Sequence, residues 1–144
     1  MRKKMKQATL ISFILIWSVL KSFAQMPLSG NLVAGEASFV DKESGEKKVY
    51  YNEGSTFSWT YNPSKQYIKL YASINSFDKE INGLYINLTK ISQTSSNSPI
   101  YIFKPSSDVM FSFYVHPKDN DVIIVVMETK NVICSFWNDR YAEN

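Results

Sequence analysis

The feature that most constrains the fold of this chain is the alternation of apolar and polar residues in short runs. The run Phe57-Ser58-Trp59-Thr60-Tyr61 is the clearest, with an aromatic residue at every second position. Because successive side chains of a β-strand point to opposite faces, this period predicts strands with one buried and one exposed face. Beyond the N-terminal segment, no window of helical length carries a sustained apolar stripe. The sequence therefore predicts an all-β fold.

These segments are separated by short stretches rich in residues that favour turns. The most regular segments are 55–61, 68–74, 84–91 and 110–115, and the less regular ones are 32–40, 48–51, 100–103, 122–127 and 132–137. The predicted turns are 43–46, 62–65, 82–83, 105–108 and 116–121. This succession is typical of an antiparallel β-sandwich or a small β-barrel of roughly eight or nine strands.

The first 24 residues differ from this pattern and predict a cleaved signal peptide. A basic start is followed by an apolar run over residues 8–20, and Ser22-Phe23-Ala24 supplies small residues before a cleavage site. A membrane-spanning helix needs roughly 20 apolar residues, which is longer than this run. Gln25 follows the predicted site, where a lipoprotein would have a cysteine. We therefore expect an exported protein, periplasmic or secreted, soluble and not lipid-anchored, that meets the membrane only during export.

Residues 25–144 are predicted to form a single all-β domain, because about 120 residues is the usual size of one domain and no linker or repeat divides them. Removing the signal peptide takes five of the 16 basic residues and none of the 13 acidic ones, so the formal net charge falls from +3 to −2. A nucleic-acid-binding protein needs a basic patch to neutralise phosphates. The remaining lysines are scattered, which argues against nucleic acid as a partner.

Residues suited to catalysis are few. The only histidine, His116, lies in a predicted turn, and the sequence has no nucleophile elbow, metalloprotease helix or phosphate-binding glycine loop. The only cysteine, Cys134, alternates with apolar neighbours, so we expect a buried, inert thiol. Asp119 and Asp121 lack the glycine and distal glutamate of a calcium-binding loop. We therefore predict a protein that is not an enzyme and has no cofactor or metal.

The register between neighbouring strands decides which way the aromatic residues of 57–61 face. If Tyr61 lies opposite Tyr67, the aromatic side chains form an exposed surface. If a turn through 62–65 places Tyr61 opposite Gln66, the same side chains are buried. We expect the second pairing, because large aromatic residues are more often buried than exposed.

The run Val122-Ile123-Ile124-Val125-Val126-Met127 is apolar on both faces of its predicted strand. In a two-layer sandwich one face normally meets water, so such a strand needs cover on both sides. A second copy of the chain is one source of that cover, and a loop, the N-terminal segment or a curled sheet is another. If the protein is a homo-oligomer, we expect Val122, Ile124 and Val126 to form the contact.

The function that we predict is a non-catalytic binding module with a protein, peptide or glycan partner. Its predicted ligand-binding residues are Tyr67, Lys69 and Tyr71, on the exposed face of one strand. The first alternative is a self-associating structural component of the cell envelope. The second is a small hydrolase with a carboxylate pair, which only spatial separation can identify; its candidates are Glu36, Asp41, Glu53 and Asp78.

Overall fold

A computed structural model describes residues 27–95, 97–116 and 119–138, with the side chains of 116 and 119–121 left out of the description. The predicted signal peptide, residues 1–24, lies outside this part of the chain. Over the residues described, no helix has both the length and the apolar character needed to cross a membrane.

The described residues form ten antiparallel strands in one continuous sheet, in the order β1-β4-β5-β6-β7-β8-β9-β10-β2-β3. The strands are β1 (Ser29–Val33), β2 (Glu36–Asp41), β3 (Lys47–Tyr51), β4 (Thr56–Asn62), β5 (Tyr67–Ile74), β6 (Lys79–Gln93), β7 (Pro99–Ser106), β8 (Val109–His116), β9 (Asp119–Glu128) and β10 (Val132–Trp137), with a short 3-10 turn, η1 (Asn75–Phe77), after β5. The prediction of an all-β fold is confirmed.

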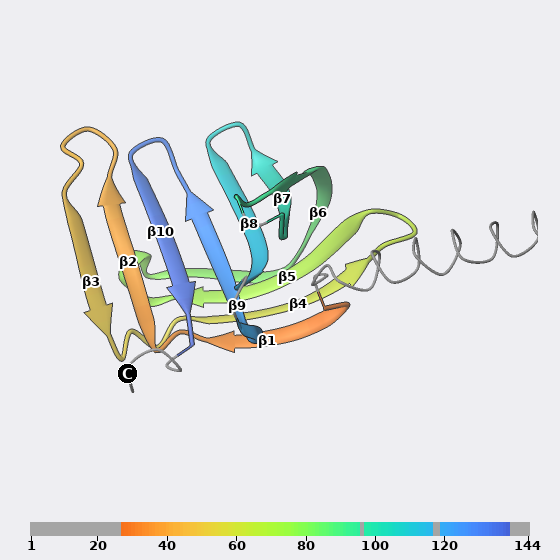
Figure 1. Cartoon of the computed structure of the whole chain (residues 1–144), viewed down its shortest axis with the longest axis horizontal. Helices are drawn as coiled ribbons and strands as arrows, with labels where there is room; N and C mark the ends of the chain where they lie inside the picture. Colours follow the sequence, from red (N-terminus) through yellow and green to blue (C-terminus); the bar gives the residue numbers. More distant parts are fainter. Residues whose placement is uncertain (1–26, 96, 117–118, 139–144) are drawn as a thin grey trace, which may run out of the picture.

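The sheet curls into a half-barrel, with β3, β2, β10, β9 and β8 standing over β1, β4 and β5 (Figure 1). The long strand β6 forms one bend, because it pairs first with β5 and then with β7. The second bend lies where β1 passes into β2 beside the link from β3 to β4. There the Ala34 N–H donates to the Ser55 carbonyl at 2.8 Å, and the Gly54 N–H donates to the Ala34 carbonyl at 2.8 Å.

The described residues form ten strands where the sequence predicts nine segments, because the second bend divides the predicted segment 32–40 between β1 and β2. Ala34 and Gly35 interrupt this segment, and the Gly35 N–H donates at 3.0 Å to the carbonyl of Trp137, the residue of β10 that lies opposite Glu36 at the start of β2. The predicted turn at Asn82-Gly83 is also wrong. These two residues lie inside β6, where the pairing with β5 shifts register at a β-bulge.

The aromatic residues of β4 face the core, as expected, but the predicted pairing is two residues out of register. Trp59 lies opposite Leu70, not Ile68, because the loop is Pro63–Gln66 and Asn62 still pairs with Tyr67. A shift of two residues keeps every side chain on the same face, so the predicted faces hold.

The core fills the inside of the curl and is rich in aromatic rings. Phe57 packs against Phe136 with ring centroids 5.0 Å apart, and Trp59 packs against Phe113 at 5.4 Å. Cys134 lies fully buried among these residues. Because the aromatic side chains of β4 are inside, the polar side chains of β4 and β5 are left on the outer face.

Candidate functional site

The outer face of β5 and β6 carries the residues predicted to bind a ligand. Tyr67, Lys69 and Tyr71 alternate with buried Ile68 and Leu70, so all three point away from the core. Tyr71 is 44% exposed, whereas Tyr67 and Lys69 are half-buried. The alternation along β5 therefore brings these three side chains to one surface.

The structure adds a residue that the sequence did not single out. Tyr85 lies directly opposite Lys69 on β6 and is 62% exposed. Its ring meets that of Tyr67 edge to face, with centroids 5.6 Å apart. We refer to Tyr67, Lys69, Tyr71 and Tyr85 together as the tyrosine–lysine surface.

Lys69 lies between two tyrosine rings of this surface. Its Nζ is 5.5 Å from the ring centroid of Tyr71 and 5.3 Å from that of Tyr85, within the range of cation–π attraction. Hydrogen bonds to the hydroxyl of Tyr71 and then of Tyr85 raise the pKa of Lys69. The two rings therefore flank the ammonium group, and their hydroxyls favour its charged form.

Gly83 leaves room for these side chains. It has a positive φ of 68°, and a Cβ atom at this position would lie 3.0 Å from the Tyr71 hydroxyl oxygen and 3.1 Å from Lys69 Cε. Glycine is the residue that adopts this backbone conformation without strain. The bulge in β6 thus allows Tyr71 and Lys69 to lie close against the backbone.

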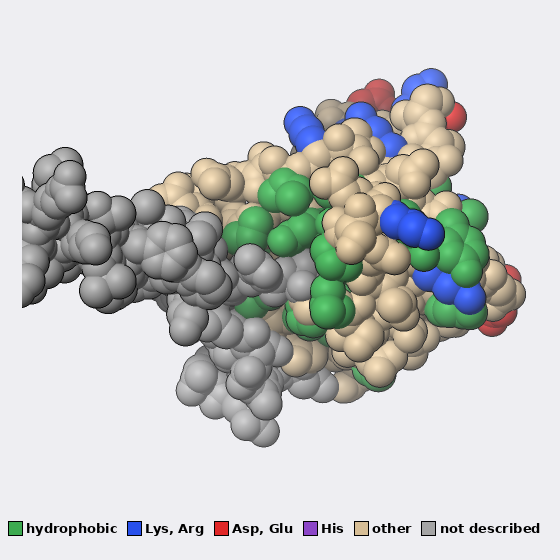
Figure 2. Space-filling model, turned by 90° about the vertical axis from the view of Figure 1, so that its right-hand side faces the viewer, with side chains coloured by type: hydrophobic (Ala, Val, Ile, Leu, Met, Phe, Trp, Pro, Cys, Tyr) green, Lys and Arg blue, Asp and Glu red, His purple; other side chains and the backbone are tan. Residues whose placement is uncertain are grey.

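The chemistry of the tyrosine–lysine surface is that of recognition. Each tyrosine offers a flat apolar face for stacking and a hydroxyl for hydrogen bonding. Lysine adds one fixed positive charge for an anionic group. On the face drawn in Figure 2, basic side chains lie beside hydrophobic ones at the right-hand end, whereas the basic side chains at the top lie near acidic ones.

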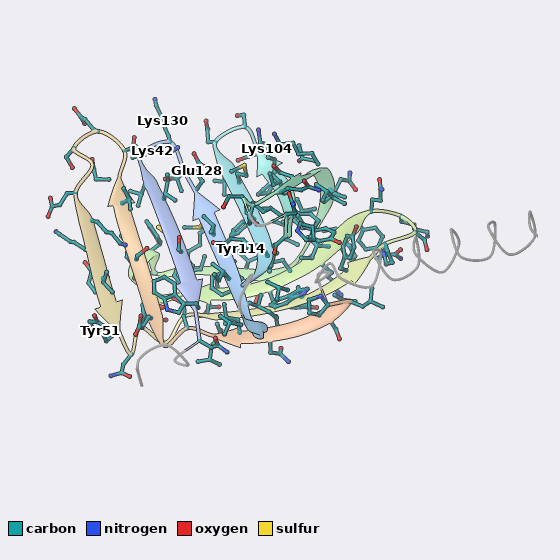
Figure 3. All side chains as sticks on the ribbon, in the orientation of Figure 1. Lys42, Tyr51, Lys104, Tyr114, Glu128 and Lys130 are labelled. Atoms are coloured by element: carbon teal, nitrogen blue, oxygen red, sulfur yellow. The ribbon has the colours of Figure 1, made fainter. Side chains whose placement is uncertain are left out.

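A second polar cluster lies at the turn end of the sheet, where Figure 3 labels Lys42, Lys104, Glu128 and Lys130. These residues border a hollow of about 240 Å³. Lys42 Nζ lies 2.6 Å from a carboxylate oxygen of Glu128, so that pair is neutralised. The cluster mixes charges and offers no aromatic face, which makes it a weaker candidate than the tyrosine–lysine surface.

A third feature is an open groove of about 500 Å³ at the mouth of the half-barrel. Phe39, Tyr50 and Phe77 line it, and the Phe39 ring contacts those of Tyr50 at 5.1 Å and Phe77 at 5.9 Å. Lys48 and Glu46 stand at its rim. No local sequence pattern indicates this groove, because its walls come from β2, β3 and η1.

The predicted self-association residues lie on the outer face of the sheet, on β9 between β8 and β10. Val122 is buried, and Ile124 and Val126 are half-buried. Their strand, β9, pairs with β8 on one side and β10 on the other, so neither edge is free. Tyr114 borders the same face, and burial raises its pKa. A second copy could reach these residues only face-on.

Two groups considered for catalysis, Glu53 and Cys134, have surroundings that suit a role in the fold. The Glu53 carboxylate accepts hydrogen bonds from Ser55 N–H at 2.7 Å, Ser55 Oγ at 2.6 Å and Ser76 Oγ at 3.0 Å, which ties η1 to the bend. Burial, and then the charge of Glu53, raise the pKa of the Cys134 thiol to about 12.

The other candidate acids are dispersed. Asp41 accepts hydrogen bonds within its own turn, Glu36 accepts one from Trp137 Nε1 at 3.1 Å, and Asp78 ends η1. No group of three or more potential metal-ligating side chains occurs in the part of the chain whose side chains are described. The side chains of His116, Asp119 and Asp121 lie outside that part.

Comparison with known family models, curated proteins and solved structures finds no match to this chain.

Proposed function

We propose that this protein is a non-catalytic binding module that acts outside the cytoplasm, after export and removal of residues 1–24. The tyrosine–lysine surface is its recognition site. The observation that carries this proposal is the placement of Lys69 between the rings of Tyr71 and Tyr85 on two paired strands. Groups held on strands lose little freedom on binding, which favours affinity.

The partner that suits this surface best is a glycan with acidic groups. Sugar rings can stack on the exposed tyrosine faces, and a carboxylate or sulfate can pair with the Lys69 ammonium. The tyrosine hydroxyls can in turn bond to sugar hydroxyls. A peptide or protein with an acidic residue beside an aromatic one is the other class of partner, and the experiment below separates the two.

The test is calorimetric titration with oligogalacturonate, an acidic glycan, and with a dextran oligomer of equal length as the neutral control. We expect binding to oligogalacturonate only. Lys69→Ala or Tyr85→Ala should weaken it about tenfold, which corresponds to about 1.4 kcal/mol. Lys90→Ala, which removes an exposed lysine elsewhere on β6, should change it less than about twofold.

Binding that Lys69→Ala leaves unchanged would refute the site. If neither glycan binds, the glycan class is wrong, and acidic peptides become the next probes of the same variants.

A further inference from the structure

Among the residues that the structure describes, β3 is an open edge of the sheet. It pairs with β2 on one side and stands at the end of the strand order (Figure 1). All five of its residues are exposed. An open edge presents unpaired N–H and C=O groups that can pair with another strand. Tyr51, at the end of β3, is 69% exposed and is labelled in Figure 3.

The ladder with β2 determines which backbone groups of β3 are free. The Asp41 N–H donates to the Glu46 carbonyl at 2.9 Å, which makes these two residues a hydrogen-bonded pair. Such pairs alternate along an antiparallel ladder, so Lys48 and Tyr50 also direct their backbone groups toward β2. The backbone groups of the three alternate residues, Lys47, Val49 and Tyr51, therefore point to the open side.

The sequence of β3, Lys47-Lys48-Val49-Tyr50-Tyr51, is self-complementary when two copies run antiparallel about Val49. Lys47 then faces Tyr51 of the second copy, Lys48 faces Tyr50, and Val49 faces Val49. Every lysine lies opposite an aromatic ring, an arrangement that cation–π attraction favours. The pairing also matches the free backbone groups, because both members of its hydrogen-bonded pairs point to the open side.

The neighbouring registers are poorer. A shift of one residue places the free backbone groups of one copy opposite residues of the other copy whose backbone groups are already bonded to β2. A shift of two residues in one direction places Lys48 against Lys48, and like charges directly opposite each other are destabilising. A shift of two in the other direction pairs only residues 49–51 within the strand. The register centred on Val49 is therefore the one that uses the whole strand without opposing lysines.

We propose that a second copy of the chain pairs with β3 along this edge and forms a symmetric dimer with one continuous sheet. The contact is isologous, because each copy contributes the same strand. It covers the exposed side chains of Val49, Tyr50 and Tyr51 and extends the groove lined by Phe39, Tyr50 and Phe77 across the dimer axis. Edge lysines commonly prevent pairing between sheets, but lysines that face tyrosines in the paired state do not prevent it here.

The contact is short, so the dimer should be weak. One pair of five-residue strands covers less surface than the roughly 1,200 Å² of a standard stable interface. We therefore expect the exported protein, purified from cells that express the full chain, to pass from monomer to dimer as its concentration rises from about 1 µM to 1 mM. Light scattering with reductant present measures this directly.

The first variant is Val49→Pro, which removes an N–H that points to the open side and leaves the ladder with β2 intact. It should weaken dimerisation at least tenfold. Val49→Thr keeps both the N–H and the branched side chain, so it should dimerise as the original protein does. A monomer at every concentration, or a dimer that Val49→Pro leaves unchanged, would overturn the proposal.

The second test examines the register and does not depend on the folding of the proline variant. Lys48→Glu should weaken dimerisation because it removes the cation, and Tyr50→Lys because it opposes two lysines. An equimolar mixture of the two variants should form dimers at least tenfold more readily than either variant alone. In the mixed dimer, the carboxylate introduced at position 48 of one chain faces the ammonium group introduced at position 50 of the other. A mixture no better than its components would exclude this register.

Discussion

Replacement of Gly83 by alanine tests whether the bulge in β6 supports the tyrosine–lysine surface. A residue with a Cβ atom in the left-handed region costs about 1–2 kcal/mol. In addition, the new atom would lie 3.0 Å from the Tyr71 hydroxyl oxygen and 3.1 Å from Lys69 Cε. Turning those side chains away from their preferred rotamers costs about 0.5–1.5 kcal/mol more. Gly83→Ala should therefore lower the free energy of unfolding by about 1.5–3.5 kcal/mol.

Gly45 provides a matched control. Its φ of 72° is close to the 68° of Gly83, but no atom lies within 4 Å of its Cβ position. Gly45→Ala should therefore carry the backbone cost alone, about 1–2 kcal/mol. The difference between the two variants measures the contact of Gly83 with Tyr71 and Lys69.

The assay is urea unfolding followed by tryptophan fluorescence, together with oligogalacturonate titration of each variant. With a slope of about 1–3 kcal/mol per molar urea, Gly83→Ala should lower the unfolding midpoint by roughly 1 M. Only this variant should also lose glycan affinity, because only it displaces Lys69. Equal stability of the two variants and equal glycan binding would refute the role assigned to the bulge.

Three further predictions concern the core, pH and the thiol. Trp59→Ala should lower the free energy of unfolding, measured with urea, by about 3–5 kcal/mol. Tyr71→Ala, on the outer face, should change it by about 0.5 kcal/mol or less. Similar changes for the two variants would contradict the faces assigned to these residues. Hydrogen bonds from the Ser44 N–H and hydroxyl, and then from the Glu43 N–H, lower the pKa of Asp41 below 3.8. Asp41 should therefore contribute stability above about pH 4, and this contribution should be lost as the pH falls through its folded-state pKa. The Asp41→Asn variant should lack this pH dependence, which an acid titration followed by circular dichroism measures. Cys134, with a pKa of about 12, should react with a disulfide reagent at pH 8 only after unfolding; a rapid reaction in the native protein would show that the thiol is accessible.

The faces of the strands could be predicted because they depend on local alternation. The aromatic residues of β4 and the polar residues of β5 occupy the predicted faces, although the pairing is shifted by two residues. That shift arises in the turn, where Gln66 adopts a positive φ of 54° and Asn62 remains in β4. Composition does not distinguish a turn at 62–65 from one at 63–66.

The bends could not be predicted, because they depend on contacts between distant residues. The interruption at Ala34-Gly35 is held by Ser55 and Trp137, which lie far away in sequence. The dipeptide Asn82-Gly83 is a strong hairpin signal, yet here it forms a bulge because the strand continues on both sides. Tyr85 was missed for the same reason, since its place opposite Lys69 follows from the register after that bulge.

The two proposed surfaces lie in different parts of the sheet, and this has a consequence for binding. Pairing through β3 leaves β5 and β6 free on each copy, so a dimer would present two tyrosine–lysine surfaces. A long acidic glycan that reaches both should bind more tightly than one copy allows, by as much as about 10²–10⁴-fold, whereas a short oligomer should gain nothing. Val49→Pro should therefore weaken binding of polygalacturonate but not of a short oligogalacturonate, and surface plasmon resonance with the protein free in solution would separate the two. If both ligands lost affinity equally, β3 would be part of the glycan site itself rather than a dimer contact.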